Sequence, residues 1–188
     1  MKIINYFSCA QKWTKQNYTG TRFRNGDEIP QVTGTTAWAN LTTPAWCHYN
    51  NDPANDAIYG KLYNWYAIND PRGFAPEGYR APSKTDWDNL IICLGGASVA
   101  GGKLKSRSTL WNAPNTGATN ESLFNALPAA TRNPNGSFDG LGSFAYWWTA
   151  TELNTNSANY VGVSTDSASA LNSTFSKKSG FSVRLIKL

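Results

Sequence analysis

The stretch Phe144-Ala145-Tyr146-Trp147-Trp148-Thr149-Ala150-Thr151 decides the fold, together with the closing run Gly180-Phe181-Ser182-Val183-Arg184-Leu185-Ile186-Lys187-Leu188. Each packs aromatic and β-branched residues into a short run bounded by glycine or polar turn residues, which is typical of a buried strand. We therefore predict that both are strands of one sheet.

The segment after Glu152 is mostly Asn, Ser, Thr and Ala, and no Lys or Arg occurs from Asn133 to Ser176. A strand pair that frames such a neutral, polar segment indicates a scaffold for display.

The composition predicts a single globular domain. The 188 residues are enough for a substantial core, and 8 Trp, 9 Tyr and 8 Phe supply more apolar area than a disordered chain carries. Charged residues make up only 15% of the chain, so the surface should be neutral and polar. We expect one domain over residues 12–188, preceded by an N-terminal arm, residues 1–11.

The net charge of +5 is spread along the chain and forms no concentrated basic patch. We therefore expect no nucleic-acid partner. No apolar run approaches the length of a membrane span, so we expect no membrane insertion. The apolar segment within residues 1–9 is too short for a signal peptide.

The cysteines and the single histidine give no sign of a metal or catalytic site. Cys9, Cys47 and Cys93 show no metal-ligand spacing, and both one disulfide and three free thiols remain open. His48 is the only histidine, and no convincing nucleophile accompanies it. We expect no metal, no cofactor and no catalytic residue.

Local patterns predict two helices. Leu62, Trp65 and Tyr66 lie at helical spacing and predict a short core helix over residues 58–68. This aromatic stripe could line a sugar site, but core packing is the favoured interpretation. A second helix should begin after Ser83, with Asp86 completing a capping box, and end at Gly95-Gly96.

Turn residues mark the connections. Asn25-Gly26 predicts a hairpin between two short strands within residues 12–30, and Asn135-Gly136 predicts another before the central strands. Residues 112–130 form a long polar loop. Residues 100–105 lack the spacing of a phosphate-binding loop, so we reject that function.

With these pieces in order, the chain resembles the Fibrobacter succinogenes major paralogous domain family. The resemblance runs over residues 12–188 and rests on the runs 23–30, 59–67, 75–82 with Trp87, 94–96, 100–105, 111–112, 124–128, 146–148 and 180–184. It implies an α+β, C-type-lectin-like fold, with a small twisted antiparallel sheet, two flanking helices and long loops. Its members are mostly secreted or surface-attached bacterial proteins without a known activity.

The resemblance also suggests how the C-terminal segment could vary. Members tend to carry large aromatic or Arg side chains after the Trp pair, whereas small residues stand here at 159, 161, 162, 164, 165, 168 and 170. C-type-lectin-like proteins serve as targets of diversity-generating retroelements, which replace exposed residues on a constant framework. Residues 152–176 fit such a cassette, and the alternative is an ordinary polar sheet face.

Two activities known for proteins with the implied fold, formylglycine generation and calcium-dependent sugar binding, are less consistent with the residues of this chain. Formylglycine-generating enzymes share the implied fold, but Cys47 and Cys93 do not lie in the C-terminal region where that chemistry would be placed. Calcium-dependent lectins carry Glu-Pro-Asn or Gln-Pro-Asp loops, which are absent here, and only Glu152 and Asp166 lie near the expected site.

We therefore predict a non-enzymatic module that binds a protein or glycan on a cell surface through residues 146–176, with Tyr160 and Phe175 as exposed aromatic contacts. The predicted ligand-binding residues are Leu153, Asn154, Asn156, Asn159, Val161, Ser164, Thr165, Ala168, Ala170 and Asn172. The expected source is a phage or gut bacterium, the expected location a virion or the cell surface, and the expected assembly a homo-oligomer such as a trimer. The alternative is a structural or adhesive module of a bacterial surface protein without a diversified site.

Overall fold

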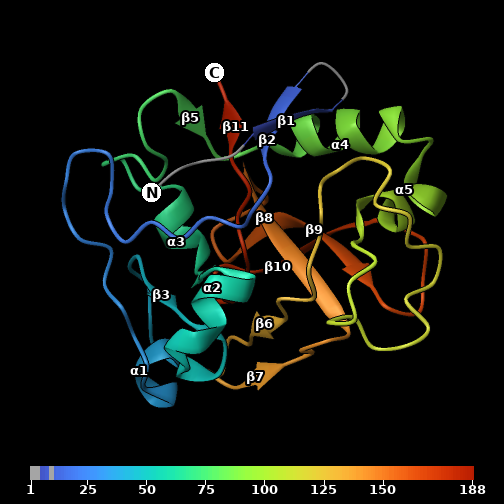
Figure 1. Cartoon of the computed structure of the whole chain (residues 1–188). Helices are drawn as coiled ribbons and strands as arrows, with labels where there is room; N and C mark the ends of the chain where they lie inside the picture. The colour runs from blue at the N-terminus through green and yellow to red at the C-terminus, as the bar shows by residue number, and fades with distance from the viewer. Residues whose placement is uncertain (1–4, 9–10) are drawn as a thin grey trace.

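The computed structural model describes residues 5–8 and 11–188, which form a mixed α/β structure of small antiparallel sheets, a few helices and long loops (Figure 1). The strands are β1 Asn5–Ser8, β2 Gln11–Thr14, β3 Trp46–Cys47, β4 Leu62–Tyr63, β5 Tyr79–Arg80, β6 Thr131–Arg132, β7 Phe138–Asp139, β8 Phe144–Glu152, β9 Ser157–Ser164, β10 Leu171–Ser176 and β11 Ile186–Lys187. The helices are α1 Thr35–Ala39, α2 Asp56–Tyr59, α3 Trp65–Ile68, α4 Lys84–Cys93 and α5 Ala97–Leu104, with 3-10 turns at Tyr49–Asn51 and Pro53–Asn55.

Two sheets organise the chain. A four-stranded sheet of order β1-β2-β11-β5 joins its two ends, because Ile186 of β11 pairs with Trp13 of β2. A three-stranded sheet of order β10-β9-β8 contains the longest strands. The predicted N-terminal arm lies partly outside the described residues, and its described part contributes β1, which pairs with β2.

The predicted strand at residues 144–151 is confirmed as β8, but its partner is not a strand of the same sheet. Only the end of the closing run, β11, is a strand, and it belongs to the four-stranded sheet. Residues 180–185 are buried and change partners along their length. The N–H of Phe181 donates to the carbonyl oxygen of Tyr63, whereas the N–H of Ser182 donates to that of Tyr146. These residues therefore link the sheets and belong to neither.

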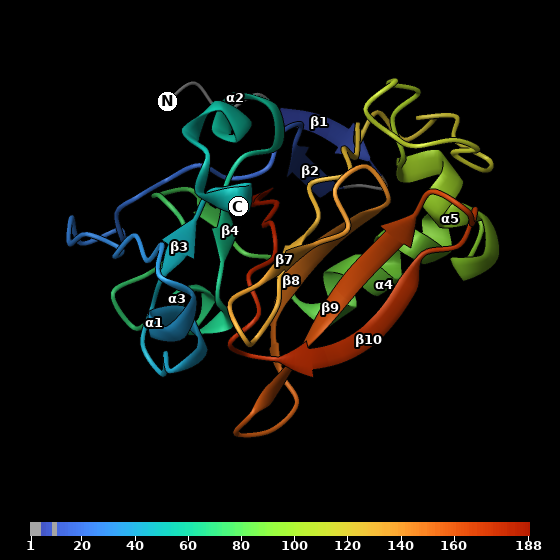
Figure 2. The ribbon, with the colours of Figure 1, turned by 90° about the horizontal axis from the view of Figure 1, so that it is seen from below.

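The main core lies between the three-stranded sheet and the helices α4 and α5, which cover one of its faces (Figure 2). Trp87 of α4 is fully buried, with its ring 4.8 Å from that of Trp13 and 5.7 Å from that of Trp147. Phe124, from the long loop, packs against all three. This aromatic cluster holds both sheets against the helices. The opposite face of the three-stranded sheet is partly covered, because Trp148, Ala158 and Tyr160 pack in a second core with residues of α3 and of the closing run.

The helix predicted after Ser83 is confirmed as α4. The Ser83 hydroxyl accepts from the N–H of Asp86, and the Asp86 carboxylate accepts from the N–H of Ser83, so the capping box is present. Gly95, with φ of 102°, follows the last turn. Arg80 donates two hydrogen bonds, of 2.5 and 2.8 Å, to the same carboxylate and so ties β5 to the start of the helix.

Asp86 makes the stability of the fold sensitive to acid. Burial raises the pKa of Asp86, but hydrogen bonds from Arg80 and Ser83 outweigh it and lower the pKa to about 2, from 3.8. Because the folded-state pKa is the lower one, this stabilisation is complete above pH 4 and is lost as the pH falls toward 2. Asp86→Asn should cost about 1–2 kcal/mol at pH 7, since Arg80 is partly exposed, and much less at pH 2.

Urea denaturation at pH 7, 4 and 2 measures this effect, with exposed Glu77→Gln as a variant that also removes one carboxylate. A loss for Asp86→Asn that is the same at pH 7 and pH 2 would contradict the assignment.

The helix predicted over residues 58–68 is wrong, because the segment divides into α2, β4 and α3. Gly60 ends α2 with φ of 74°, and a Cβ there would lie 2.9 Å from the Cβ of Asn17. The aromatic residues of the segment do pack inside, as the favoured interpretation held. Trp65 is 2% exposed, and its indole N–H donates to the carbonyl oxygen of Thr149.

The two predicted hairpins have different outcomes. Asn135-Gly136 does connect the paired strands β6 and β7. Asn25-Gly26 forms a turn with Gly26 at φ of 96°, but its flanks meet only in one isolated bridge, Arg22 to Glu28. The two strands predicted around it are therefore absent from the described part of residues 12–30, apart from β2.

The basic residues are only partly available to a partner. Five basic side chains among the described residues are buried, namely Lys61, Lys105, Arg132, Lys177 and Arg184. Arg132, for example, donates to the carbonyl oxygens of Val32, Thr33 and Gly136 and lies over the ring of Trp38. Much of the positive charge therefore serves internal packing.

The cysteines differ from one another. Cys93 is disulfide-bonded, whereas Cys47 is buried as a free thiol. Cys9 lies outside the described residues.

Candidate functional site

The three-stranded sheet leaves part of one face uncovered, at the edge of the second core, and aromatic side chains gather there. Successive side chains of a strand point to opposite faces. Ala145 and Trp147 of β8 belong to the core beneath α4 and α5, so Phe144 and Tyr146 lie on the opposite face. We name this feature the aromatic groove and define it by Phe144, Tyr146, Tyr160, Gly162, Leu171 and Phe175.

The rings of the aromatic groove form a contiguous row across the three strands. Phe144 stacks on Tyr146 with ring centroids 5.8 Å apart and an interplanar angle of 13°. Tyr146 meets Tyr160 edge-on at 5.6 Å, and Tyr160 meets Phe175 edge-on at 6.2 Å. Phe144, Leu171 and Phe175 remain 37%, 53% and 42% exposed. Solvent therefore reaches apolar side chains of β8 and β10, whereas Tyr160 of β9, which joins them, is 9% exposed.

Two hollows lie along this row. One, of about 310 Å³, extends toward the loop after β9 and is lined by Phe144, Tyr146, Tyr160, Gly162, Val163, Ser164, Ser167, Ser169 and Leu171. The other, of about 120 Å³, extends toward β6 and β7 and is lined by Thr131, Asn133, Asp139, Gly140, Phe144, Tyr146, Tyr160, Phe175 and Phe181. They share three aromatic residues, so they are two ends of one groove.

Glycine shapes the floor of the groove. A Cβ at Gly162 would lie 2.8 Å from Cδ1 of Tyr146. The absence of a side chain there lets the Tyr146 ring lie across β9. Any larger residue at this position would push the ring out of the row.

The tyrosines of the groove stay neutral. Burial raises the pKa of Tyr146 to about 12, and the neighbouring Tyr160 and Asp139 act in the same direction. Burial also raises the pKa of Tyr160, which a hydrogen bond with the Ser173 side chain partly opposes. Near neutral pH the groove thus offers apolar ring faces and uncharged hydroxyls, with Asp139 and Asn133 at one end.

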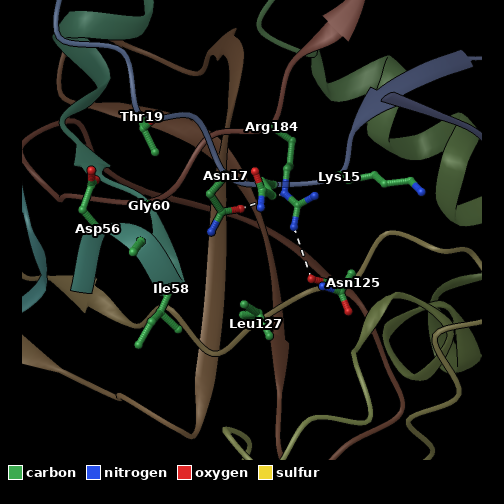
Figure 3. A pocket seen from close by; sticks show the side chains of 11 residues that line it. Lys15, Asn17, Thr19, Asp56, Ile58, Gly60, Asn125, Leu127 and Arg184 are labelled. Atoms are coloured by element: carbon green, nitrogen blue, oxygen red, sulfur yellow. Dashed lines mark hydrogen bonds between the residues drawn. The ribbon is translucent and has the colours of Figure 1, made fainter. Parts of the chain in front are cut away.

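A third hollow, of about 280 Å³, lies near the four-stranded sheet and is polar (Figure 3). Its charged groups already have partners inside the protein. Asp56 pairs with Lys61 at 2.7 Å, and Arg184 donates to the side-chain oxygen of Asn17 at 2.7 Å. Lys15 extends away from the centre of the hollow (Figure 3). This hollow therefore belongs to the structural framework of the domain and is not our candidate binding site.

The residues of this framework meet at Asn17. Its side-chain oxygen accepts from the indole N–H of Trp147 and from Arg184, while its amide nitrogen donates to the Tyr59 carbonyl and to Ser182. All four side-chain hydrogen-bonding positions of this amide are in use. Asn17 therefore joins β8, the closing run and the segment after β2.

The structure does not bring the ten predicted ligand-binding residues into one surface. Leu153, Asn154 and Asn156 lie exposed at the β8–β9 hairpin, where the Asn154 side chain accepts from the N–H groups of Asn156 and Ser157. Val161 and Ala170 are 0% and 4% exposed and belong to the core beneath α4 and α5.

Most of the remaining predicted residues serve local structure. Asn159 donates to the carbonyl oxygen of Thr151, and Asn172 donates to Asp88 of α4 at 2.7 Å. Thr165 donates to the carbonyl oxygen of Asn112. Ala168, whose carbonyl oxygen accepts from the N–H of Gly102, holds the loop after β9 against α5. Ser164 alone of the ten lines the aromatic groove.

Of the two aromatic residues predicted as exposed contacts, Phe175 is exposed, but the prediction is wrong for Tyr160, which is only 9% exposed because its ring packs against those of Tyr146 and Phe181. Phe144, Tyr146 and Leu171 were not among the predicted contact residues. The sequence feature that could have revealed these residues is the two-residue period of a strand, because residues 144 and 146 share one face, as do residues 171, 173 and 175. The alternation alone does not tell which face the helices cover.

The described residues offer little for metal or nucleophilic chemistry. No group of three or more His, Cys, Asp or Glu side chains within residues 5–8 and 11–188 could hold a metal ion. Burial lowers the pKa of His48, and its nearest acid is Asp56 at 3.7 Å. Burial raises the pKa of the neighbouring Cys47 thiol to about 12, which makes it a poor nucleophile. Within the same residues, no helix combines the length and the apolar character of a bilayer-crossing segment.

Comparison with known proteins identifies the family. The model of the Fibrobacter succinogenes major domain matches residues 9–187, nearly the whole chain, and confirms the resemblance seen in its sequence motifs. No curated protein and no solved structure matches the chain. The chain therefore belongs to the Fibrobacter succinogenes major domain family.

Proposed function

We propose that this chain is a non-enzymatic binding module whose aromatic groove contacts a glycan or protein on a cell surface. The observation that supports the proposal is the row of contiguous rings on the partly uncovered sheet face, of which Phe144 and Phe175 are exposed to solvent. Contiguous exposed apolar surface costs solubility and commonly marks an interaction site.

The chemistry of the groove favours an extended ligand. A shallow, open row of rings suits stacking against sugar faces or apolar side chains, while the tyrosine hydroxyls, Asn133 and Asp139 can form hydrogen bonds at its edges. A deeply enclosed small molecule would need a closed cavity. We therefore favour a polysaccharide segment or a protein loop over a small metabolite.

The finer features of the proposal rest on indirect support. A C-type-lectin-like arrangement is supported by the pairing of the two chain ends in one sheet and by helices on one face of the other. Export to a cell surface or virion is supported by the disulfide bond of Cys93, because disulfides persist in oxidising compartments. Diversification by a retroelement stays a prediction, and in such a cassette the buried Val161 and Ala170 would belong to the constant framework.

The proposal predicts that Phe175→Ala weakens binding by about 10-fold to 100-fold, because one exposed aromatic contact contributes about 1–3 kcal/mol. The free energy of unfolding should fall by less than about 1 kcal/mol, since Phe175 is half exposed. Binding is measured on an array of bacterial and host polysaccharides and then by titration with the best ligand.

Ile92→Ala is the matched control, because Ile92 is an exposed apolar residue, 71% accessible, on α4 at the other face of the sheet. It should leave binding unchanged. Equal affinity of Phe175→Ala and the parent protein for every retained ligand would point to the alternative, a structural or adhesive module without a dedicated groove.

A further inference from the structure

β10 is an edge strand without the features that usually protect an edge. It pairs with β9 on one side, and no strand of the described chain pairs with its other side. Figure 2 shows it as the outermost strand of the three-stranded sheet. Its sequence, Leu-Asn-Ser-Thr-Phe-Ser, has no charge and no proline, and its register with β9 is continuous, without a bulge. Charges, proline and bulges are the usual means of preventing edge-to-edge pairing.

The exposed side chains of β10 alternate in a way that suits pairing with itself. Leu171, Ser173 and Phe175 share the face of the aromatic groove, and all three are exposed. In an antiparallel pair, residues directly opposite each other must point to the same face. If Ser173 opposes its own counterpart, Leu171 opposes Phe175 of the second copy, and Phe175 opposes Leu171.

From this self-complementarity we propose that two copies of this chain pair antiparallel through β10, with Ser173 at the twofold axis. The pairing joins two three-stranded sheets into one of six strands. It satisfies outward backbone groups of both edges and removes from water two pairs of exposed apolar side chains, which are 53% and 42% accessible in the single chain. A second copy is favoured over an unrelated strand because one sequence supplies both members of each apolar pair.

The pairing has a consequence for the groove, and this consequence alone rests on the proposed function. Leu171 lines the larger hollow and Phe175 lines the smaller one. In the dimer, Leu171 of the second copy lies beside Phe175 of the first, so each copy contributes a side chain that lines the groove of the other. The two grooves then form one continuous surface across the twofold axis.

The expected dimer is weak and closed. One six-residue strand pair buries less than the roughly 1,600 Å² of a standard interface, so a micromolar dissociation constant is expected. A twofold contact uses the same edge of both copies and leaves no edge free. It therefore gives a dimer, in place of the trimer that the sequence suggested.

The test is sedimentation equilibrium of the whole chain over a range of concentrations, with no ligand added. The parent protein should show a reversible monomer–dimer equilibrium. Ser173→Lys should abolish the dimer, because two like charges would face each other at the axis, while its melting temperature shows that the chain is folded. Thr42→Lys adds the same charge at an exposed position away from the sheets and should leave the dimer intact.

Cysteine cross-linking tests the register. Ser173→Cys should form an intermolecular disulfide under mild oxidation with oxidised glutathione, whereas Thr174→Cys, on the opposite face and out of register with its counterpart, should not. A parent protein that stays monomeric, a dimer that tolerates Ser173→Lys, or cross-linking through position 174 and not 173 would each overturn the proposal. Because no ligand is present in these measurements, failure of the dimer is distinct from failure of the binding function.

Discussion

Trp147→Ala is expected to lower the free energy of unfolding by about 3–5 kcal/mol, enough to unfold much of the population of a marginally stable domain. Trp147 is fully buried, and its ring centroid lies 5.7 Å from that of Trp87 and 5.3 Å from that of Phe124. Its removal leaves a cavity between β8 and α4. It also leaves the side-chain oxygen of Asn17 without the indole donor that it accepts from at 2.9 Å.

Trp147→Phe separates these two causes. It keeps most of the ring volume and loses the indole N–H, so its cost should be well below that of the alanine variant. Urea denaturation followed by far-ultraviolet circular dichroism measures both variants. A loss below about 1 kcal/mol for Trp147→Ala, typical of a surface substitution, would mean that β8 does not form the centre of the core.

The parts of the fold that the sequence predicted are those set by neighbours along the chain. The start of α4 depends on the reciprocal hydrogen bonds of Ser83 and Asp86, three residues apart. The β6–β7 connection depends on the conformational freedom of Asn135-Gly136. Such signals remain the same whatever the rest of the chain does, so the sequence alone is enough to find them.

The parts that were wrong depend on contacts between distant residues. The helical spacing at residues 58–68 is real, but Gly60 takes a positive φ and lies against Asn17, which breaks the helix. The closing run has the composition of a strand, yet its backbone bonds to Tyr63, Arg132 and β8 in turn. No local pattern contains these partners.

For the candidate site, too, the local sequence predicts some features, and others depend on contacts between distant residues. The sequence named Tyr160 and Phe175, which line the groove that we propose as the contact surface, but it also included Val161, which packs in the core beneath the helices. The face of β9 that is buried depends on where α4 and α5 pack, and these helices precede β9 by more than fifty residues. Alternation gives the two faces, and only the tertiary structure tells which one is free.

The last prediction concerns Lys105, because this residue anchors the loop after β9, which lines one end of the groove. The side chain is fully buried, and its ammonium donates to the carbonyl oxygens of Thr116, Ser164 and Ser167 at 2.9, 2.7 and 2.7 Å. Ser164 and Ser167 line the larger hollow. Residues 100–105, whose spacing is not that of a phosphate-binding loop, therefore contribute a cation that ties two loops together.

Lys105→Met keeps the length of the side chain and removes its donors. Three carbonyl oxygens then lose their hydrogen bonds in the interior, at about 1–3 kcal/mol each, while the desolvation cost of the ammonium is relieved. The net loss at pH 7 should be about 2–4 kcal/mol by urea denaturation. Ligand affinity of the folded fraction should fall as well, because the loop of Ser164 and Ser167 loses its anchor. Lys103→Met, a partly exposed neighbour on α5, serves as the control.

The pH dependence distinguishes Lys105 from an ordinary packing residue. Burial lowers the pKa of Lys105 from 10.5 to about 8, with Asp166 acting in the opposite direction. Between these two values the unfolded chain binds one more proton than the folded chain, so the stability of the parent protein rises with pH in that window. Lys105→Met has no amine at this position, so its stability does not rise in this way. Its deficit, the difference in free energy of unfolding from the parent protein, should grow by about 1 kcal/mol or more between pH 7 and 9.5. A deficit that stays constant between pH 7 and 9.5 would show that the buried amine keeps its proton, because the three carbonyl oxygens would then outweigh the effect of burial.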